Sequence, residues 1–151
     1  MKVFLASDHA GFKLKEKIKS FLKRKKISYE DMGAYSYNKN DDYPDFIIKT
    51  AEKVAKTKSK GIIIGFSGQG EAIAANKVRH IRAVVCYVKN KKIIKLSREH
   101  NDANILSLGA GFLSEKEAFE LIWLWLRTPF SREQRHKRRI KKITNYERKS
   151  M

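Results

Sequence analysis

The sequence predicts an α/β fold in which helices cover both faces of a parallel sheet. Short apolar runs alternate with amphipathic stretches along the chain, which is the pattern of repeated βα units. One run, 61–64, is unbroken and rich in isoleucine, as expected for a strand buried on both faces. Polar or glycine-rich segments follow the first and third runs, where a doubly wound sheet places its ligand site. We therefore expect one doubly wound domain over residues 1–151.

Each element has its own local signal. The expected strands are residues 3–6, 27–32, 61–64, 81–85 and 105–108. Helices are expected over 11–25, from Pro44, from Glu71 and over 91–99, with proline well placed in a first turn. Ser114 and Glu117 have capping-box spacing and open a further helix that Pro129 ends. The basic C-terminal segment, 131–151, is expected to be helical over 132–146 and to end in a tail.

Composition excludes several classes of protein. The 151 residues are 42% apolar, which argues against a disordered basic protein. No apolar run approaches the roughly 18 residues of a membrane span, and no signal-peptide pattern is present, so we expect a cytoplasmic protein without a membrane partner. A single cysteine excludes an intramolecular disulfide. The net charge of +18 suggests nucleic-acid binding as a rival hypothesis, and residues 127–151 carry 10 basic and 2 acidic groups of this balance.

Three polar segments are expected to gather at the carboxyl ends of strands: 7–11, 67–71 and 98–102. In the second, glycines allow a tight turn that aims backbone N–H groups inward, which suits a phosphate or a developing oxyanion. A plain tight turn explains the same glycines about as well, since neither a Walker pattern nor G-x-G-x-x-G is present. Glu71 adds the carboxylate that proton abstraction beside a carbonyl requires, although a carboxylate there also favours the helix dipole.

The two histidines of these segments have a plain interpretation and a functional one. A single histidine after a strand is more often packed or solvated than catalytic, but His9 and His100 each stand beside an aspartate or asparagine. Such side chains also serve as metal ligands. No short ligand spacing supports a metal site, so we predict none. Cys86 is expected to be a small core residue.

Five segments carry a resemblance to a known family. They are 7–11, 42–44, 73–77, 81–83 and 97–104, and Arg135, His136 and Arg139 follow them. In these segments the chain resembles the type-B ribose-5-phosphate isomerases, a family that includes the galactose-6-phosphate isomerase subunits. The resemblance implies a Rossmann-like three-layer domain with a five-stranded parallel sheet. It also implies aldose–ketose interconversion of a phosphorylated sugar through a cis-enediolate, without a metal or nucleotide cofactor.

The resemblance implies a role for each matching residue. His100 would open the furanose ring with Asp8 as its partner, and Ser67 would hold the enediolate oxygens. The backbone of the loop from Gly68 to Gly70 would assist Ser67. The residues expected to grip the phosphate are His9, Arg135 and Arg139. The residues expected to line the pocket are Tyr43, Asn101 and His136. The family forms dimers, sometimes paired into tetramers, whose sites lie between subunits.

Two positions depart from the usual pattern. Many members place a catalytic cysteine where this chain has Gly65, whereas a second branch uses a glutamate directly after the glycine loop. This chain matches the second branch, so Glu71 is the expected base, since one carboxylate that reaches C1 and C2 can remove and return the same proton. Members usually have an arginine at the position of Gly111. Its absence would cost on the order of 1.5–3 kcal/mol of phosphate binding unless another cation compensates.

The leading hypothesis is an isomerase of ribose 5-phosphate and ribulose 5-phosphate. An isomerase of a tetrose or hexose phosphate is the nearest alternative, because Gly111 leaves the sugar open. A non-catalytic protein that binds nucleic acid through its basic C-terminal helix is disfavoured, since that helix holds the expected phosphate-binding arginines and no reading motif is visible. An inactive relative that serves as an assembly subunit is also disfavoured, since a base, a ring opener and an anion hole are all expected.

Overall fold

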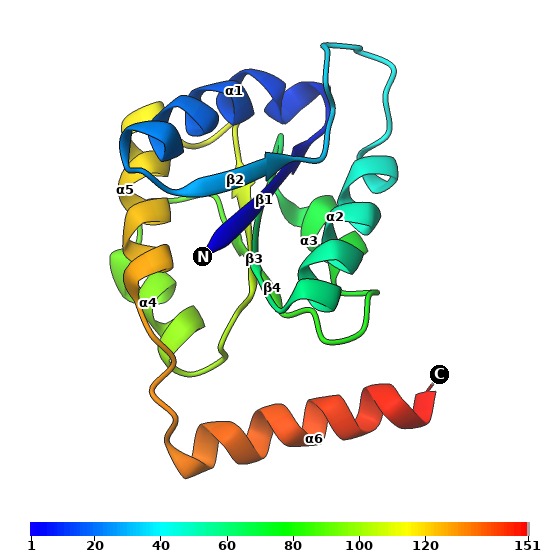
Figure 1. Ribbon diagram of the computed structural model, residues 1–151, viewed down its shortest axis with the longest axis vertical. Helices are drawn as coiled ribbons and strands as arrows, with labels where there is room; N and C mark the ends of the chain where they lie inside the picture. The colour runs from blue at the N-terminus through cyan, green and yellow to red at the C-terminus, as the bar shows by residue number, and fades with distance from the viewer. Residues whose placement is uncertain (151) are drawn as a thin grey trace.

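The computed structural model describes residues 1–150, in which five parallel strands form one sheet between two layers of helices (Figure 1). The strands are β1 (Lys2–Ser7), β2 (Ser28–Asp31), β3 (Lys60–Gly65), β4 (Ala83–Cys86) and β5 (Ile105–Gly109). Their order across the sheet is β2-β1-β3-β5-β4, and each neighbouring pair is parallel. The predicted Rossmann-like α/β fold is therefore confirmed.

The winding of the sheet reverses between β1 and β3. Strand β2 lies on one side of β1 and β3 lies on the other, so the connections that leave the two strands diverge. The register pairs Ser7 with Ile64, which brings the carboxyl ends of β1 and β3 side by side. In open α/β sheets this reversal opens a crevice that binds ligands. The loops after β1 and β3 are thus the first place to look for a site.

Two hydrophobic cores fill the space between the sheet and its helices. Helices α1 (His9–Arg24), α4 (Lys91–Glu99) and α5 (Glu115–Arg127) pack on one face, and α2 (Tyr43–Thr57) and α3 (Gln69–Ala75) on the other (Figure 1). In β3, Ile62 and Ile64 belong to the first core and Ile63 to the second. The strand is therefore buried on both faces, as its unbroken apolar run predicts.

The sequence predicts the start of α5 correctly but misplaces the start of β4. The capping box of Ser114 and Glu117 is present in both directions, with hydrogen bonds of 3.1 and 2.9 Å. Strand β4 begins two residues later than the predicted 81–85. The reason is that Ile81 closes a turn onto Val78, and the backbone N–H of Arg82 donates to the Asn104 side chain instead of to a strand.

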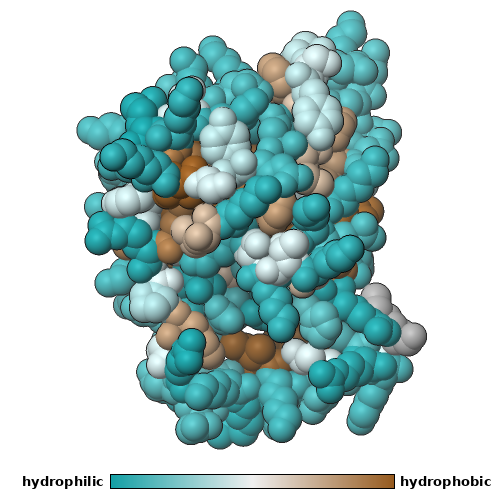
Figure 2. All heavy atoms as spheres, viewed as in Figure 1, coloured by the Kyte–Doolittle hydropathy of each residue, from teal (hydrophilic) through white to brown (hydrophobic). Residues whose placement is uncertain are grey.

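The last helix, α6 (Gln134–Ser150), stands apart from the sheet (Figure 1). It is longer than the predicted 132–146, and Met151 lies outside the described residues. Among its described residues, only His136 is buried. In Figure 2 it forms a largely hydrophilic rim, with a hollow between it and the rest of the molecule. None of the helices in residues 1–150 has the length and hydrophobicity to cross a membrane.

Candidate active site

The loops after β1 and β3 bring polar side chains together at one edge of the sheet. Ser7 ends β1 and is fully buried, and Asp8 caps α1 by accepting a hydrogen bond of 3.2 Å from the backbone N–H of Gly11. An aspartate favours such a position because it satisfies a free N–H of the first helical turn. Capping fixes the Asp8 carboxylate close to the end of β3, since Gly11 packs directly on Ile64.

The glycine-rich loop after β3 turns sharply into α3. Gly68 has a φ of +80°, a conformation that glycine adopts without strain, and its carbonyl accepts a 2.6 Å hydrogen bond from the Ser107 hydroxyl. The Ser67 hydroxyl accepts a bond of 3.3 Å from the backbone N–H of Gln69. Gly70 lies under the ring of Tyr43, which leaves no room for a side chain there. The loop is therefore a fixed turn with Tyr43 packed across it.

Glu71 lies in the first turn of α3 and is only 4% exposed. Its carboxylate occupies the space beside Gly65 that any side chain at that position would need. Burial raises the pKa of Glu71 above its ordinary value, and the negative charge of Asp8 acts in the same direction. A buried carboxylate with a raised pKa is a stronger base than an exposed one and is typical of proton-transfer sites.

His9 opens α1 and pairs with a residue that sequence reasoning missed. Its Nδ1 lies 2.6 Å from Oδ1 of Asp41, and its backbone N–H donates to the same oxygen at 3.0 Å. Asp8, His9 and Asp41 place possible metal-binding atoms within 4.8 Å of one another. Two ligands of one zinc ion would lie further apart than 2.6 Å, since each sits about 2.0–2.2 Å from the metal. We assign no metal to this trio, and the metal-free site stays a prediction.

The third polar segment lies at the opposite edge of the sheet, so the expected gathering of all three segments is wrong within one chain. A loop that enters a strand lies at its amino end, and the segment 98–102 leads into β5. Asn104 follows this segment and accepts a hydrogen bond from Gly61 at the start of β3. From Gly61 to Gly65 the strand rises about 3.3 Å per residue, roughly 13 Å in all. His100 and Asp8 of one chain are therefore not partners.

A second group of expected site residues forms around His100. Its ring stacks on that of His136 with centroids 4.1 Å apart. Burial lowers the pKa of His136, the neighbouring His100 and Arg135 act in the same direction, and its Nε2 is buried without a hydrogen-bond partner. Arg135 pairs with Glu133 at the surface, and Asn101 and Arg139 are also exposed. This group joins the end of α4 to the start of α6.

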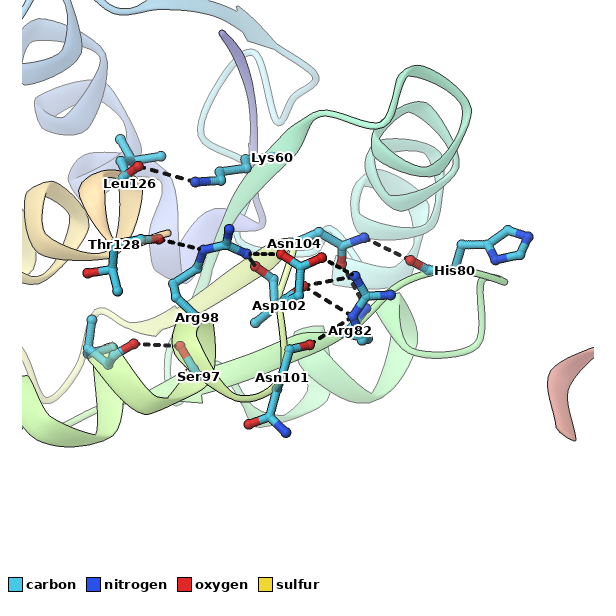
Figure 3. Close-up of polar contacts among 12 residues, drawn as sticks. Lys60, His80, Arg82, Ser97, Arg98, Asn101, Asp102, Asn104, Leu126 and Thr128 are labelled. Carbon is cyan, nitrogen blue, oxygen red and sulfur yellow. Dashed lines mark hydrogen bonds and ion pairs between the residues drawn. The ribbon is translucent and has the colours of Figure 1, made fainter. Parts of the chain in front are cut away.

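Two arginines fix the loop that carries His100 and Asn101 (Figure 3). Arg98 is 6% exposed and donates to the carbonyls of Thr128 and Ala103 and to the Asp102 carboxylate. Arg82 donates to the carbonyls of Asn101 and Asp102 at 2.9–3.1 Å. The arginines thus satisfy backbone groups at the end of α4 and hold the loop in a single conformation.

Comparison with known proteins identifies the family. Residues 3–143 match the family model described as Ribose/Galactose Isomerase. The chain belongs to this family and is a sugar isomerase. It is 42% identical to ribose-5-phosphate isomerase B of Mycolicibacterium paratuberculosis over 98% of this chain and 92% of that one. A Clostridium thermocellum ribose-5-phosphate isomerase B structure has a TM-score of 0.93, 42% identity and full coverage of both chains.

A solved relative also carries a ligand. The Mycoplasma genitalium ribose-5-phosphate isomerase B structure contains bound ribulose-5-phosphate. Its TM-score to this chain is 0.91 at 39% identity, over 97% of this chain and 96% of that one.

The surroundings of Gly111 leave no space for a side chain, because the ring of Phe66 lies where a Cβ would be. Phe66 is 62% exposed and packs edge-on against Phe112 at 5.4 Å. An arginine at this position would need Phe66 to move. The absence of a side chain at position 111 therefore fits the place of the Phe66 ring in this chain.

The structure brings together seven of the twelve expected site residues. Those at the carboxyl edge are Asp8, His9, Tyr43, Ser67, Gly68, Gly70 and Glu71. Those near the amino edge are His100, Asn101, Arg135, His136 and Arg139. Asp41 had no signal in the sequence beyond its place in a polar loop.

Proposed function

We propose that the protein interconverts ribose 5-phosphate and ribulose 5-phosphate with Glu71 as the proton-transfer base. The observation that carries this proposal is the buried Glu71 carboxylate, which sits beside the glycine loop with a raised pKa. Relatives about 40% identical over nearly the whole chain are named ribose-5-phosphate isomerase B, and one of them binds ribulose-5-phosphate. A basic group next to donors for an oxyanion is what aldose–ketose isomerisation requires.

The proposed reaction passes through a cis-enediolate. Glu71 removes the proton from C2 of the open-chain aldose while the C1 carbonyl oxygen takes up the negative charge. The protonated Glu71 then returns its proton to C1, while the proton of the C2 hydroxyl passes to O1, so the C2 oxygen becomes the ketone carbonyl and O1 becomes a hydroxyl. Ser67 and the backbone of Gly68 and Gly70 would stabilise the enediolate oxygens. The raised pKa of Glu71 brings it closer to neutral pH, which favours transfer in both directions.

We further propose that a second copy of the chain completes each site. Ring opening and phosphate binding are assigned to residues near the amino edge, which are the second group described above. A homodimer, alone or paired into a tetramer, would set this group of one subunit against Asp8, His9 and Glu71 of the other. The stacked pair of His100 and the buried His136 would then face the sugar ring, and Arg135 and Arg139 would meet its phosphate together with His9.

Glu71→Gln tests the proposed base. We expect kcat for ribose 5-phosphate to fall by about 10²–10⁴, the usual contribution of a positioned proton-transfer group. Binding of inorganic phosphate is expected to persist, because Gln keeps the size of the side chain. Glu52→Gln on the exposed surface of α2 is the matched control and keeps wild-type kcat. A Glu71→Gln enzyme with wild-type kcat would disprove the assignment of the base.

A sugar phosphate of another length is the second candidate, and the glycine at position 111 is the observation that favours it. Gly111 has no side chain, and the Phe66 ring fills the space where one would stand, so the positive charge that the resemblance implies at position 111 is absent. A coupled assay with four-, five- and six-carbon aldose phosphates compares kcat/KM directly. We expect the five-carbon substrate to have the highest value, and a higher value for another length would assign that substrate instead.

A further inference from the structure

Asp41 makes two hydrogen bonds to His9 and is largely buried, unlike a typical surface contact. One oxygen of its carboxylate accepts two hydrogen bonds from His9, from the backbone N–H at 3.0 Å and from Nδ1 at 2.6 Å. The Asp41 side chain is 8% exposed, and its other oxygen, Oδ2, is buried without a hydrogen-bond partner. The backbone N–H of Asp41 in turn donates to Asn38 within the loop. His9 is therefore held by Asp41 at two points, one on its backbone and one on its ring.

The bond to Nδ1 determines what the rest of the ring can do. A carboxylate only accepts hydrogen bonds, so Nδ1 carries the proton and Nε2 is on the opposite edge of the ring. The His9 side chain is 33% exposed, so a ligand can reach it. When both nitrogens carry protons, Nε2–H is a charged donor for an anion.

We propose that Asp41 is a positioning residue for substrate phosphate: it holds the His9 ring at Nδ1 and so directs Nε2–H toward the phosphate. This inference rests on the proposed function, in which His9 grips that phosphate. Asp41 acts only through His9 and touches no reacting atom. Its role is to supply a donor of fixed direction at one end of the sugar.

The charges around His9 support this role. The hydrogen bond to Asp41 raises the pKa of His9, and the negative charges of Asp8 and Asp41 add to the effect against the opposing effect of burial. The other titratable group against the ring is Tyr37, whose ring meets it edge-on at 6.3 Å. In the completed site, Arg135 and Arg139 of the second copy would oppose protonation until the phosphate binds between them. Asp41 offsets that repulsion.

The kinetic test compares Asp41→Asn with the wild type between pH 5.5 and 8.5. Without the carboxylate, His9 is expected to titrate near the ordinary histidine pKa of about 6.5, so about one tenth of it is protonated at pH 7.5. We expect KM for ribose 5-phosphate to rise at pH 7.5, by at most about tenfold, to approach the wild-type value at pH 5.5, and kcat to change little. Asp45→Asn removes the same charge from exposed α2 and keeps the wild-type KM profile. Superimposable profiles for Asp41→Asn and the wild type would overturn the proposal.

Two further measurements separate this inference from the proposed function. NMR titration of the wild-type protein gives the His9 pKa without any substrate, and a value at or below 6.5 would overturn the proposal even if Asp41→Asn does not fold. Binding of inorganic phosphate over the same pH range reports on His9 when no isomerase activity is found. In a His9→Gln background, Asp41→Asn is expected to have no further effect on KM or on phosphate binding. A further loss there would show that Asp41 acts by another route.

Discussion

A single methyl group at Gly65 is expected to disable the proposed base without unfolding the protein. A Cβ at this position would overlap the Glu71 carboxylate, far inside the 3.0 Å that real Cβ contacts keep. The strand backbone cannot yield, because Gly65 lies at the end of β3 between β1 and β5. The carboxylate must therefore move by on the order of 1 Å, and a displacement of that size costs about 10²-fold in rate.

The assay measures kcat for Gly65→Ala at saturating ribose 5-phosphate, together with thermal unfolding and the binding of inorganic phosphate. We expect kcat to fall about 100-fold while phosphate binding stays within about twofold. Gly61→Ala is the matched control in the same strand, since a Cβ there meets only the side chains of Val54 and Ile105, at 3.0 and 3.1 Å. Gly61→Ala is expected to lower the free energy of unfolding and to leave kcat unchanged. Wild-type kcat in Gly65→Ala would refute the placement of the base.

Three further predictions concern other buried groups. Folding raises the pKa of Glu71, so ionisation of this side chain at pH 7 opposes folding. Glu71→Gln is therefore expected to raise the free energy of unfolding at pH 7. The gain is expected to disappear below the ordinary carboxyl pKa of about 4.3, and urea unfolding above and below that pH measures it. Arg98→Ala is expected to lower the free energy of unfolding by about 3–5 kcal/mol, because it leaves buried carbonyls without donors. The control Lys95→Ala, on the exposed side of α4, is expected to change it by less than about 0.5 kcal/mol. Burial raises the pKa of Cys86 and shields its thiol. A thiol reagent is therefore expected to react far more slowly with the native protein than with the protein in denaturant. Equal rates would contradict the burial of Cys86.

The strands were predictable because each carries its own signal. The isoleucines of β3 alternate between two cores, and a strand buried on both faces needs no polar positions. The start of β4 was misplaced because the hydrogen bonds that end the preceding turn come from Val78 and from the side chain of Asn104, a residue 22 positions away from Arg82. A pattern of neighbouring residues contains no such distant partner.

The sequence shows which loop each candidate residue belongs to, but not which of these loops gather in the fold. Glu71 follows a glycine loop, and its chemistry is visible in that short segment. The order of β5 and β4 in the sheet and the placement of the loop before β5 depend on the whole topology, which is why the segment 98–102 was expected with the other two polar segments. Asp41 escaped notice for a related reason. Its partner His9 lies 32 residues earlier, and the loop between them has no regular pattern.

This chain has Gly111 where the resemblance implies an arginine, so the proposed phosphate site has one expected cation fewer. An arginine side chain differs from a histidine in that its charge does not change near neutral pH. In the proposed site, the charge of His9 depends on pH, and its hydrogen bond to Asp41 raises its pKa. A chain with an arginine at position 111 would have one more positive charge at this site, and that charge would not change with pH near neutrality.

Phe66→Gly combined with Gly111→Arg is therefore expected to flatten the rise of KM with pH, since Phe66→Gly clears the space that the new side chain needs. Gly111→Arg alone is expected to lower stability, because it drives the arginine against the Phe66 ring. A double variant whose KM still rises as steeply as that of the wild type would show that position 111 lies too far from the phosphate to share its charge. His9 would then be the main cation of this edge regardless of the residue at 111.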